Sequence, residues 1–148
     1  MQCEPVDDDT LALFTIMPEA IDEHWGLVGP LLEEFERETG TASAEEIKDQ
    51  ARNGLSQVWG LATPAGVRGV CVTRVHVTPR NRFCSIWVAQ GSNVFGDLLR
   101  VYDAIETWAQ SVGCTAMHIH GRRGWKRILP GYREVAVVLE KSLVGVKH

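Results

Sequence analysis

The sequence predicts an α/β protein whose central sheet is mixed, mostly antiparallel and flanked by helices, and three patterns predict it. Alternating apolar residues and turn signals over 57–89 indicate three antiparallel strands joined by tight turns. Apolar residues at helical spacing indicate helices before and after this region. The strand, helix and strand over 83–120 suit a parallel crossover. The chain has 148 residues, so we expect one domain over 1–148.

The N-terminal part predicts a strand followed by a helix. Residues 10–17, with the sequence TLALFTIM, indicate the strand, and Pro18 suits the first turn of the helix. Apolar residues at helical spacing extend this helix to Thr39, and Gly40 is typical of a helix C-terminus. Three residues in its middle leave open a break into two shorter helices: Gly26, Gly29 and Pro30.

A second helix and three strands are predicted next. Ser43 and Glu46 form a capping box, which indicates a helix over 43–53. Turn signals at 64–66 and 79–81 then separate alternating apolar segments. The three predicted strands are residues 57–63, 67–77 and 83–89.

The C-terminal part begins with a long amphipathic helix over 94–112, which Gly113 ends. Apolar side chains recur on one face of this helix, so we expect that face to cover the sheet. Three further elements are predicted after it: a strand over 115–120, a short helix over 124–129 and a buried strand over 135–139.

Composition excludes several classes of protein. The net charge of −4 argues against a general nucleic-acid binder. No apolar run approaches the roughly 18 residues of a membrane span, so no membrane partner is expected. The acidic N-terminus does not resemble a signal peptide, which predicts a soluble, cytoplasmic protein. No C-x-x-C pair is present, so buried free thiols are expected at Cys71, Cys84 and Cys114.

The order of the predicted elements and the segment 87–143 resemble the GNAT superfamily of acyl-CoA-dependent N-acyltransferases. In that family, the loop before the third helix starts with Gln or Arg, contains two small residues and is followed by a Leu-Leu pair. In register with Leu98-Leu99, the loop here reads Gln90-Gly91-Ser92-Asn93-Val94-Phe95. Asn93 and Phe95 stand where the family has small residues, so this loop is atypical. A bulky ring at 95 would stand where phosphate and backbone should approach closely.

The resemblance implies a sheet that opens between its fourth and fifth strands. Acetyl-CoA would lie in that gap, with its pyrophosphate at the start of the helix. The free N–H groups and the dipole of a helix N-terminus favour an anion there. The residues implied in cofactor binding are Val88, Ala89, Gln90, Gly91, Ser92, Asn93, Val94, Phe95 and Gly96.

Two candidate catalytic residues follow from the same resemblance. Gly131-Tyr132 occupies the place of the family's Gly-Phe turn, and no tyrosine lies at the family's usual position for the general acid, near 125–127. Tyr132 could replace it only if the local geometry shifts; otherwise its ring packs under the last strand. His120 is the candidate base, since it lies near the C-terminal end of its strand. His118 shares its face, but no third ligand accompanies them, so no metal is predicted.

Two charged clusters admit more than one interpretation. An acidic run consists of Glu33, Glu34, Glu36 and Glu38. This run could line the side of the site that receives an amine, or it could be a solvated helix face. The basic cluster could contact a phosphate or an acidic surface, or it could have no function: Arg122, Arg123, Lys126 and Arg127. His76 is interpreted as an exposed strand residue.

Two functions are therefore open. The first is an acyl-CoA-dependent N-acyltransferase with an atypical pyrophosphate loop, acting on an amine-bearing small molecule or protein. The second is a catalytically silent binding or assembly module with the same fold and a protein partner. The segment 120–143 also resembles the C-termini of small GNAT-like proteins of bacteriophages, which implies a viral origin and a location in the host cytoplasm or the virion.

Overall fold

The computed structural model describes residues 10–119, 131–133, 135 and 139–143. Its centre is a five-stranded sheet in which neighbours in the sequence are neighbours in space. The first three pairings are antiparallel and the fourth, between β4 and β5, is parallel. The mixed, mostly antiparallel sheet of the prediction is confirmed. The strands are β1 (Ala12–Ile16), β2 (Gln57–Thr63), β3 (Gly66–Val77), β4 (Arg82–Gly91) and β5 (Ala116–Ile119).

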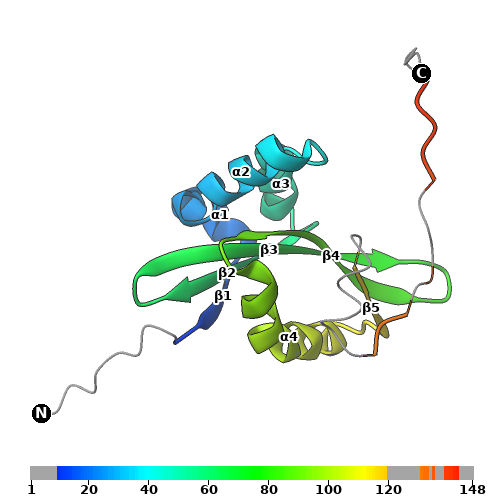
Figure 1. Cartoon of the computed structure of the whole chain (residues 1–148). Coiled ribbons are helices and arrows are strands. Elements are labelled where there is room, and N and C mark those ends of the chain that lie inside the picture. Colours follow the sequence, from blue (N-terminus) through cyan, green and yellow to red (C-terminus); the bar gives the residue numbers. More distant parts are fainter. Residues whose placement is uncertain (1–9, 120–130, 134, 136–138, 144–148) are drawn as a thin grey trace, which may run out of the picture.

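Helices cover the two faces of the sheet unequally (Figure 1). Three helices lie on one face: α1 (Ile21–His24), α2 (Gly29–Thr39) and α3 (Ala44–Arg52). On the other face lies the single long helix α4 (Val94–Ser111), which connects β4 to β5. Because β4 and β5 are parallel, the connection between them must cross over a face of the sheet, and α4 is that crossover.

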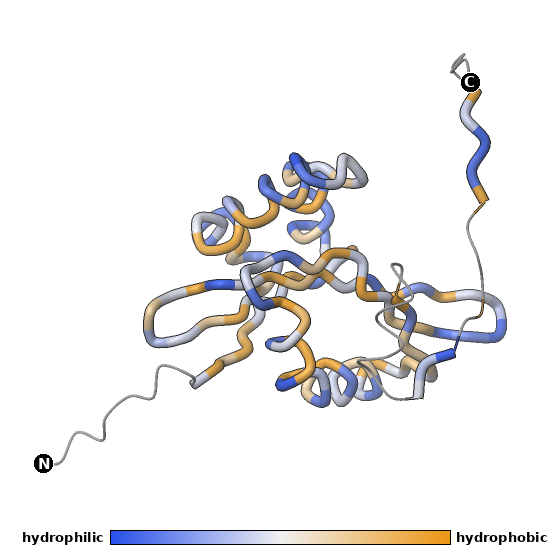
Figure 2. The backbone as a smooth tube through the Cα atoms, in the orientation of Figure 1, coloured by the Kyte–Doolittle hydropathy of each residue, from blue (hydrophilic) through white to orange (hydrophobic). Residues whose placement is uncertain are grey.

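Each face of the sheet has its own hydrophobic core. Apolar segments lie along the strands and on the sides of the helices that meet the sheet (Figure 2). The core under α1–α3 includes Val70, Val72 and Val88. The core under α4 includes Trp59, Leu98 and other buried side chains. Strand alternation therefore divides β3 and β4 between two cores.

The helix expected over 18–39 is broken into four short pieces. Two 3-10 turns, η1 (Pro18–Ala20) and η2 (Trp25–Leu27), flank α1 before α2 begins. Pro30 in the first turn of α2 has no N–H to continue an earlier helix. At Gly29, a Cβ atom would lie 2.7 Å from the indole Nε1 of Trp25, so the glycine makes room for that ring. The break that the sequence left open is therefore present.

Two predicted helix termini are confirmed: the C-terminus of α2 and the N-terminus of α3. Gly40 ends α2 in the left-handed conformation, with φ of 63°. Ser43 caps α3, because its Oγ accepts a hydrogen bond from the N–H of Glu46 at 3.0 Å. Glu36 then joins the two helices, since its carboxylate accepts a hydrogen bond from the N–H of Ala44 at 2.7 Å.

Two elements expected after β5 are not seen in the described residues. The short helix expected over 124–129 lies outside the described residues. Of the strand expected over 135–139, only Val135 and Leu139 are described; both are exposed and neither is in a strand. Among the described residues, no helix has the length and hydropathy that a membrane span requires.

Candidate functional site

The predicted cofactor loop lies at the junction of β4 and α4. Val88 to Gly91 are the end of β4, and Val94 begins the helix after a two-residue turn. Asn93 is the N-cap residue, but its side chain makes no capping hydrogen bond. The Asn93 side chain therefore leaves the N–H groups of the first helical turn uncapped by itself, and these groups lie at the positive end of the helix dipole. All nine predicted residues lie on this continuous strand, turn and first turn.

Packing requires glycine at position 91 of the loop and leaves little space for a side chain at position 96. A Cβ atom on Gly91 would lie 2.5 Å from the carbonyl oxygen of Arg68 and 2.8 Å from the Cα of Gly69. Gly69 and Gly91 are directly paired across β3 and β4. At Gly96, a Cβ atom would lie 3.0 Å from the side chain of Asn93. Glycine therefore allows β3 and β4 to approach closely just before α4 begins.

Phe95, the atypical residue of the loop, presents its side chain on the surface. It is 50% exposed, and Leu99, one turn further along α4, is 49% exposed. Val94 instead points into the core under α4. Gln90, which agrees with the family's loop, donates a hydrogen bond from its amide to the carboxylate of Glu38 at 3.2 Å.

A buried ion pair holds the first turn of α4, and our sequence analysis missed it. Asp97 is completely buried, and its two carboxylate oxygens accept hydrogen bonds from the guanidinium of Arg68. The distances are 2.8 Å from Nε to Oδ2 and 2.6 Å from Nη2 to Oδ1. Asn93 also donates to Oδ1, at 3.4 Å. One signal was available: Asp97 lies on the same helix face as Val94 and Val101, where a carboxylate needs a partner.

Arg68 reaches Asp97 because β3 contains a bulge. Leu61 pairs with Gly69 and Ala62 pairs with Val67, so Arg68 is the extra residue of β3. A bulge redirects a side chain relative to strict alternation. Here the bulged residue is Arg68, and its guanidinium lies against the first turn of α4.

The C-terminal part of β4 extends past the described part of β5. Parallel pairing joins Phe83–Ile86 to Ala116–Ile119. From Trp87 to Gly91, β4 has no β5 partner among the described residues. The backbone N–H and C=O groups along this edge are available to a ligand that lies beside the strand. The family resemblance implies an opening between the fourth and fifth strands; β5 is described only as far as Ile119, so this opening stays a prediction.

A second bulge lies at this opening. Val72 pairs with Val88 and Thr73 pairs with Ile86, so Trp87 is the extra residue of β4. Trp87 and Val88 consequently both pack against the core under α1–α3. Bulges are common beside functional sites, where they redirect side chains.

The predicted catalytic residues are only partly within the described structure. His120 lies outside the described residues. Tyr132 is half-buried against the core under α4, and its hydroxyl is hydrogen bonded to that of Tyr102. Burial raises the pKa of Tyr132 to about 12, and burial also raises the pKa of Tyr102. Both hydroxyls are thus protonated at neutral pH, and Tyr132 can donate a proton.

His76 differs from its interpretation as an exposed residue. It is half-buried, its Nε2 is hydrogen bonded to the Oγ of Ser85 at 2.9 Å, and its ring stacks on Phe83. His118 stacks on the other side of Phe83 and is paired with Ser85 across β4 and β5. Cross-strand pairing therefore places two histidines and a serine on one face, which the sequence alone did not indicate.

The remaining candidates contribute less to a site. Cys71, Cys84 and Cys114 are buried free thiols, as expected. Burial raises the pKa of Cys84 to about 11 and also raises the pKa values of the other two, so none is a ready nucleophile. The basic cluster at 122–127 lies outside the described residues. No group of three potential metal ligands gathers within the described ranges.

Solved structures with the same arrangement are acetyltransferases. An aminoglycoside acetyltransferase from an uncultured soil metagenomic sample superposes with a TM-score of 0.68 at 11% identity, over 92% of this chain and 98% of that one. This chain has the GNAT fold. A GNAT family acetyltransferase from Staphylococcus aureus gives a TM-score of 0.61 at 11% identity, covering 90% and 99% of the two chains.

One further GNAT-like structure is informative about the ligand. A predicted acetyltransferase from Clostridium acetobutylicum, solved with acetyl-CoA, matches with a TM-score of 0.66 at 11% identity. The match covers 90% of this chain and 97% of that chain. No family model and no curated protein matches the sequence. At these identities, the likeness to solved GNAT proteins concerns the fold.

Proposed function

We propose that this GNAT-fold protein is an acyl-CoA-dependent N-acyltransferase with an atypical pyrophosphate loop. One observation carries the proposal: from Trp87 to Gly91, β4 has no β5 partner among the described residues, and α4 begins a few residues later. A strand edge without a partner in the described part of the chain and the N-terminus of a long helix, which the Asn93 side chain does not cap, are thereby adjacent. Together they suit a ligand that has an amide-containing chain and a diphosphate.

The loop residues would hold acetyl-CoA in two ways. The N–H groups at Val88 and Ala89 would bond to the pantetheine arm, and the turn and first helical turn, Gly91 to Gly96, would receive the pyrophosphate. Arg68 offsets the charge of Asp97, which would otherwise oppose an anion at this end of α4. The related fold that was solved with acetyl-CoA supports this choice of ligand.

The chemistry is direct transfer of the acyl group to an amine. The amine nitrogen attacks the carbonyl carbon of the thioester, so a C–N bond forms as the C–S bond breaks. We assign His120 as the base that takes the proton lost by the amine, and Tyr132 as the acid that protonates the leaving thiolate. The Tyr132 hydroxyl is protonated at neutral pH, as an ordinary tyrosine is, and burial makes it a weaker acid by raising its pKa to about 12.

The acceptor is proposed to be an amine on a small molecule or a protein. The structure of the related aminoglycoside acetyltransferase in complex with sisomicin supports an amine-bearing small molecule. A single domain over 1–148 and a cytoplasmic location, as the sequence predicts, belong to the same proposal.

Titration with acetyl-CoA by calorimetry tests the proposal, using the native protein, Phe95→Gly and the control Leu99→Gly. Leu99 is equally exposed on α4 but lies one turn beyond the loop. We expect micromolar binding by the native protein, and tighter binding by Phe95→Gly because the ring no longer crowds the phosphates. We expect no such gain for Leu99→Gly. Absence of binding by all three proteins would contradict an acyl-CoA site.

One observation favours a second candidate, a catalytically silent binding or assembly module; its bacteriophage origin stays a prediction of the sequence. Phe95 and Leu99 are half exposed and lie four residues apart on one face of α4. Such a pair suits a protein partner. In the same titration, binding gained only by Phe95→Gly would favour this module, with the ring of Phe95 blocking the loop.

A further inference from the structure

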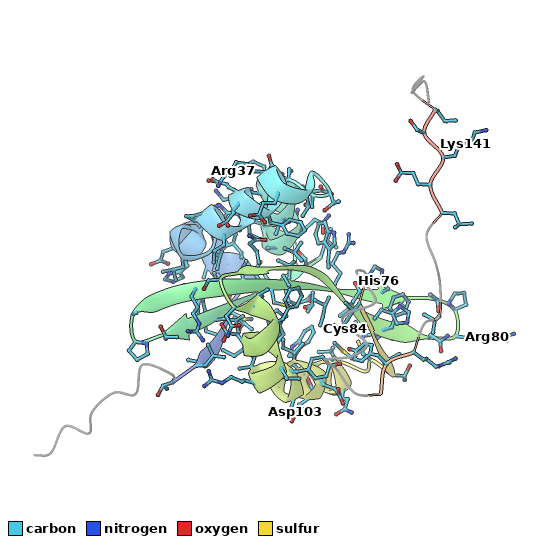
Figure 3. The ribbon with its side chains drawn as sticks, viewed as in Figure 1. Arg37, His76, Arg80, Cys84, Asp103 and Lys141 are labelled. Carbon is cyan, nitrogen blue, oxygen red and sulfur yellow. The ribbon has the colours of Figure 1, made fainter. Side chains whose placement is uncertain are left out.

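A polar and aromatic surface lies on the sheet face that carries α1–α3, on the part of the β3–β4 hairpin that extends beyond these helices (Figure 1). We call it the Arg74 face. His76 marks it in Figure 3, and Cys84 points to the opposite face of the sheet. The Arg74 face consists of Arg74, His76, Phe83, Ser85, Trp87 and His118.

Strand register assembles this face from three strands. Ser85 on β4 pairs with Arg74 on β3 and with His118 on β5. His76 on β3 pairs with Phe83, the next residue of β4 on this face. Residues that share a face across paired strands lie within contact distance of one another. The surface is therefore a property of the sheet and does not depend on a loop.

Arg74 is the unsatisfied group of this face. Its guanidinium carbon lies 3.7 Å from the centre of the Trp87 ring. Within the described part of the chain, the guanidinium forms no ion pair or hydrogen bond, and Nε is shielded from water. Burial lowers the pKa of Arg74, and the exposed carboxylate of Glu46 only partly opposes this effect. A partly desolvated cation with no ion-pair partner among the described residues favours an incoming anion.

Flat rings and polar atoms surround this cation. Phe83 is stacked between two imidazoles, with centroid distances of 4.8 Å to His76 and 4.0 Å to His118. The hydrogen bond between His76 and Ser85 fixes the first of these rings. The face thus combines aromatic rings with a few polar groups in fixed positions, as the linings of small-molecule sites do.

The position of Trp87 connects this face to the opening in the sheet. Trp87 is the bulged residue of β4, and Val88, the next residue, lies where β4 has passed its described β5 partners. A ligand held by Arg74 above the Trp87 ring therefore lies beside the proposed place of the acyl group. A guanidinium suits a carboxylate in particular, because its parallel N–H groups match the two oxygens.

We infer that the Arg74 face binds the acceptor, and that the acceptor is a small amine that also carries a carboxylate, such as an amino acid. Arg74 receives the carboxylate, and the amine is directed towards the opening between β4 and β5. This inference rests on the proposed function for its catalytic part, whereas binding of the carboxylate does not require acetyl-CoA.

A binding experiment without acetyl-CoA tests the carboxylate part. Free amino acids and their carboxamides, which differ only in the anionic group, are titrated by ligand-observed NMR into native protein, Arg74→Gln and Arg80→Gln. Arg80 is an exposed arginine in the turn between β3 and β4, so it controls for net charge. We expect the native protein and Arg80→Gln to favour the free acids by roughly tenfold to a hundredfold, and Arg74→Gln to lose this preference.

Activity with the same compounds tests the catalytic part, with release of CoA thiol as the measurement. The preference for free acids should appear in kcat/KM and vanish in Arg74→Gln, while acetyl-CoA binding stays unchanged. If acids bind through Arg74 but acetyl-CoA does not bind, the proposed function fails and the carboxylate site stands. Equal binding of acids and amides, no binding of either, or an unaltered preference in Arg74→Gln would overturn the inference.

Discussion

Asp97 and Arg68 show how one residue pair determines the geometry of the candidate site. A buried carboxylate in the first turn of α4 would be unfavourable alone, because burial removes its hydration. The two hydrogen bonds from Arg68 supply the missing partner and join β3 to α4 across 29 residues of sequence. The orientation of the loop from Gly91 to Gly96 therefore depends on a contact outside the loop.

Arg68→Met is expected to lower the free energy of unfolding by about 3 kcal/mol, since it leaves the Asp97 carboxylate buried without a counter-charge. Urea denaturation measures this change. The control is Arg52→Met, which removes exposed ion pairs to Asp22 and Asp49 and should have a smaller effect. In the double variant Arg68→Met with Asp97→Leu, much of the lost stability should return. Equal losses from Arg68→Met and Arg52→Met would contradict the role given to the pair.

Irregularities in β3 and β4 matter more for the site than the regular parts of these strands. One bulge places Arg68 beside α4, and the other places Trp87 and Val88 on the same side of the sheet. Between them, Gly69 and Gly91 allow the two strands to approach closely. The end of β4 and the start of α4 are thus positioned by backbone packing.

Gly91→Ala is expected to separate the ends of β3 and β4, because its Cβ atom would lie 2.5 Å from the carbonyl oxygen of Arg68. We expect a loss of about 1–3 kcal/mol in the free energy of unfolding, together with weaker binding of acetyl-CoA. Urea denaturation and calorimetry measure the two effects. Gly26→Ala is the control, since nothing lies within 4 Å of its added Cβ atom. An unchanged free energy of unfolding in Gly91→Ala would contradict this expectation, because β3 and β4 would then accommodate the added methyl group without loss of stability.

The whole molecule consists of a sheet between two cores, and the Tyr102–Tyr132 contact attaches a segment beyond β5 to the core under α4. The two hydroxyls belong to residues 30 apart in sequence. Tyr132 lies among the partly buried side chains that pack on this core. Because these are the chain's 2 tyrosines, tyrosinate absorbance reports on this contact alone.

Absorbance titration of the native protein is expected to show tyrosinate forming only near pH 12 or above, whereas in urea both groups should titrate near their ordinary pKa of about 10. The folded protein holds these protons more tightly than the unfolded chain. The resulting stabilisation is therefore present below about pH 10 and is lost as the pH rises towards 12. Tyr132→Phe should reduce this alkaline loss of stability. Two native tyrosines that titrate near pH 10 would contradict the buried contact.

Local sequence signals determined the elements. The capping box at Ser43, the helix end at Gly40 and the strand, turn and helix around 90–96 were predictable, because each depends on neighbouring residues and on periodicity. The family resemblance correctly implied the GNAT fold, and the place where the sheet opens stays a prediction. His120 and the basic cluster remain predictions of the sequence.

Tertiary structure alone decided which side chains meet. The pair Arg68–Asp97, the contact Tyr102–Tyr132 and the cross-strand position of His76 join residues that no local pattern relates. Strand register and the two bulges determine these contacts, and register depends on the packing of both cores at once. The sequence by itself therefore determined most of the described elements and the fold class, whereas packing between distant segments determined which side chains meet at the candidate site.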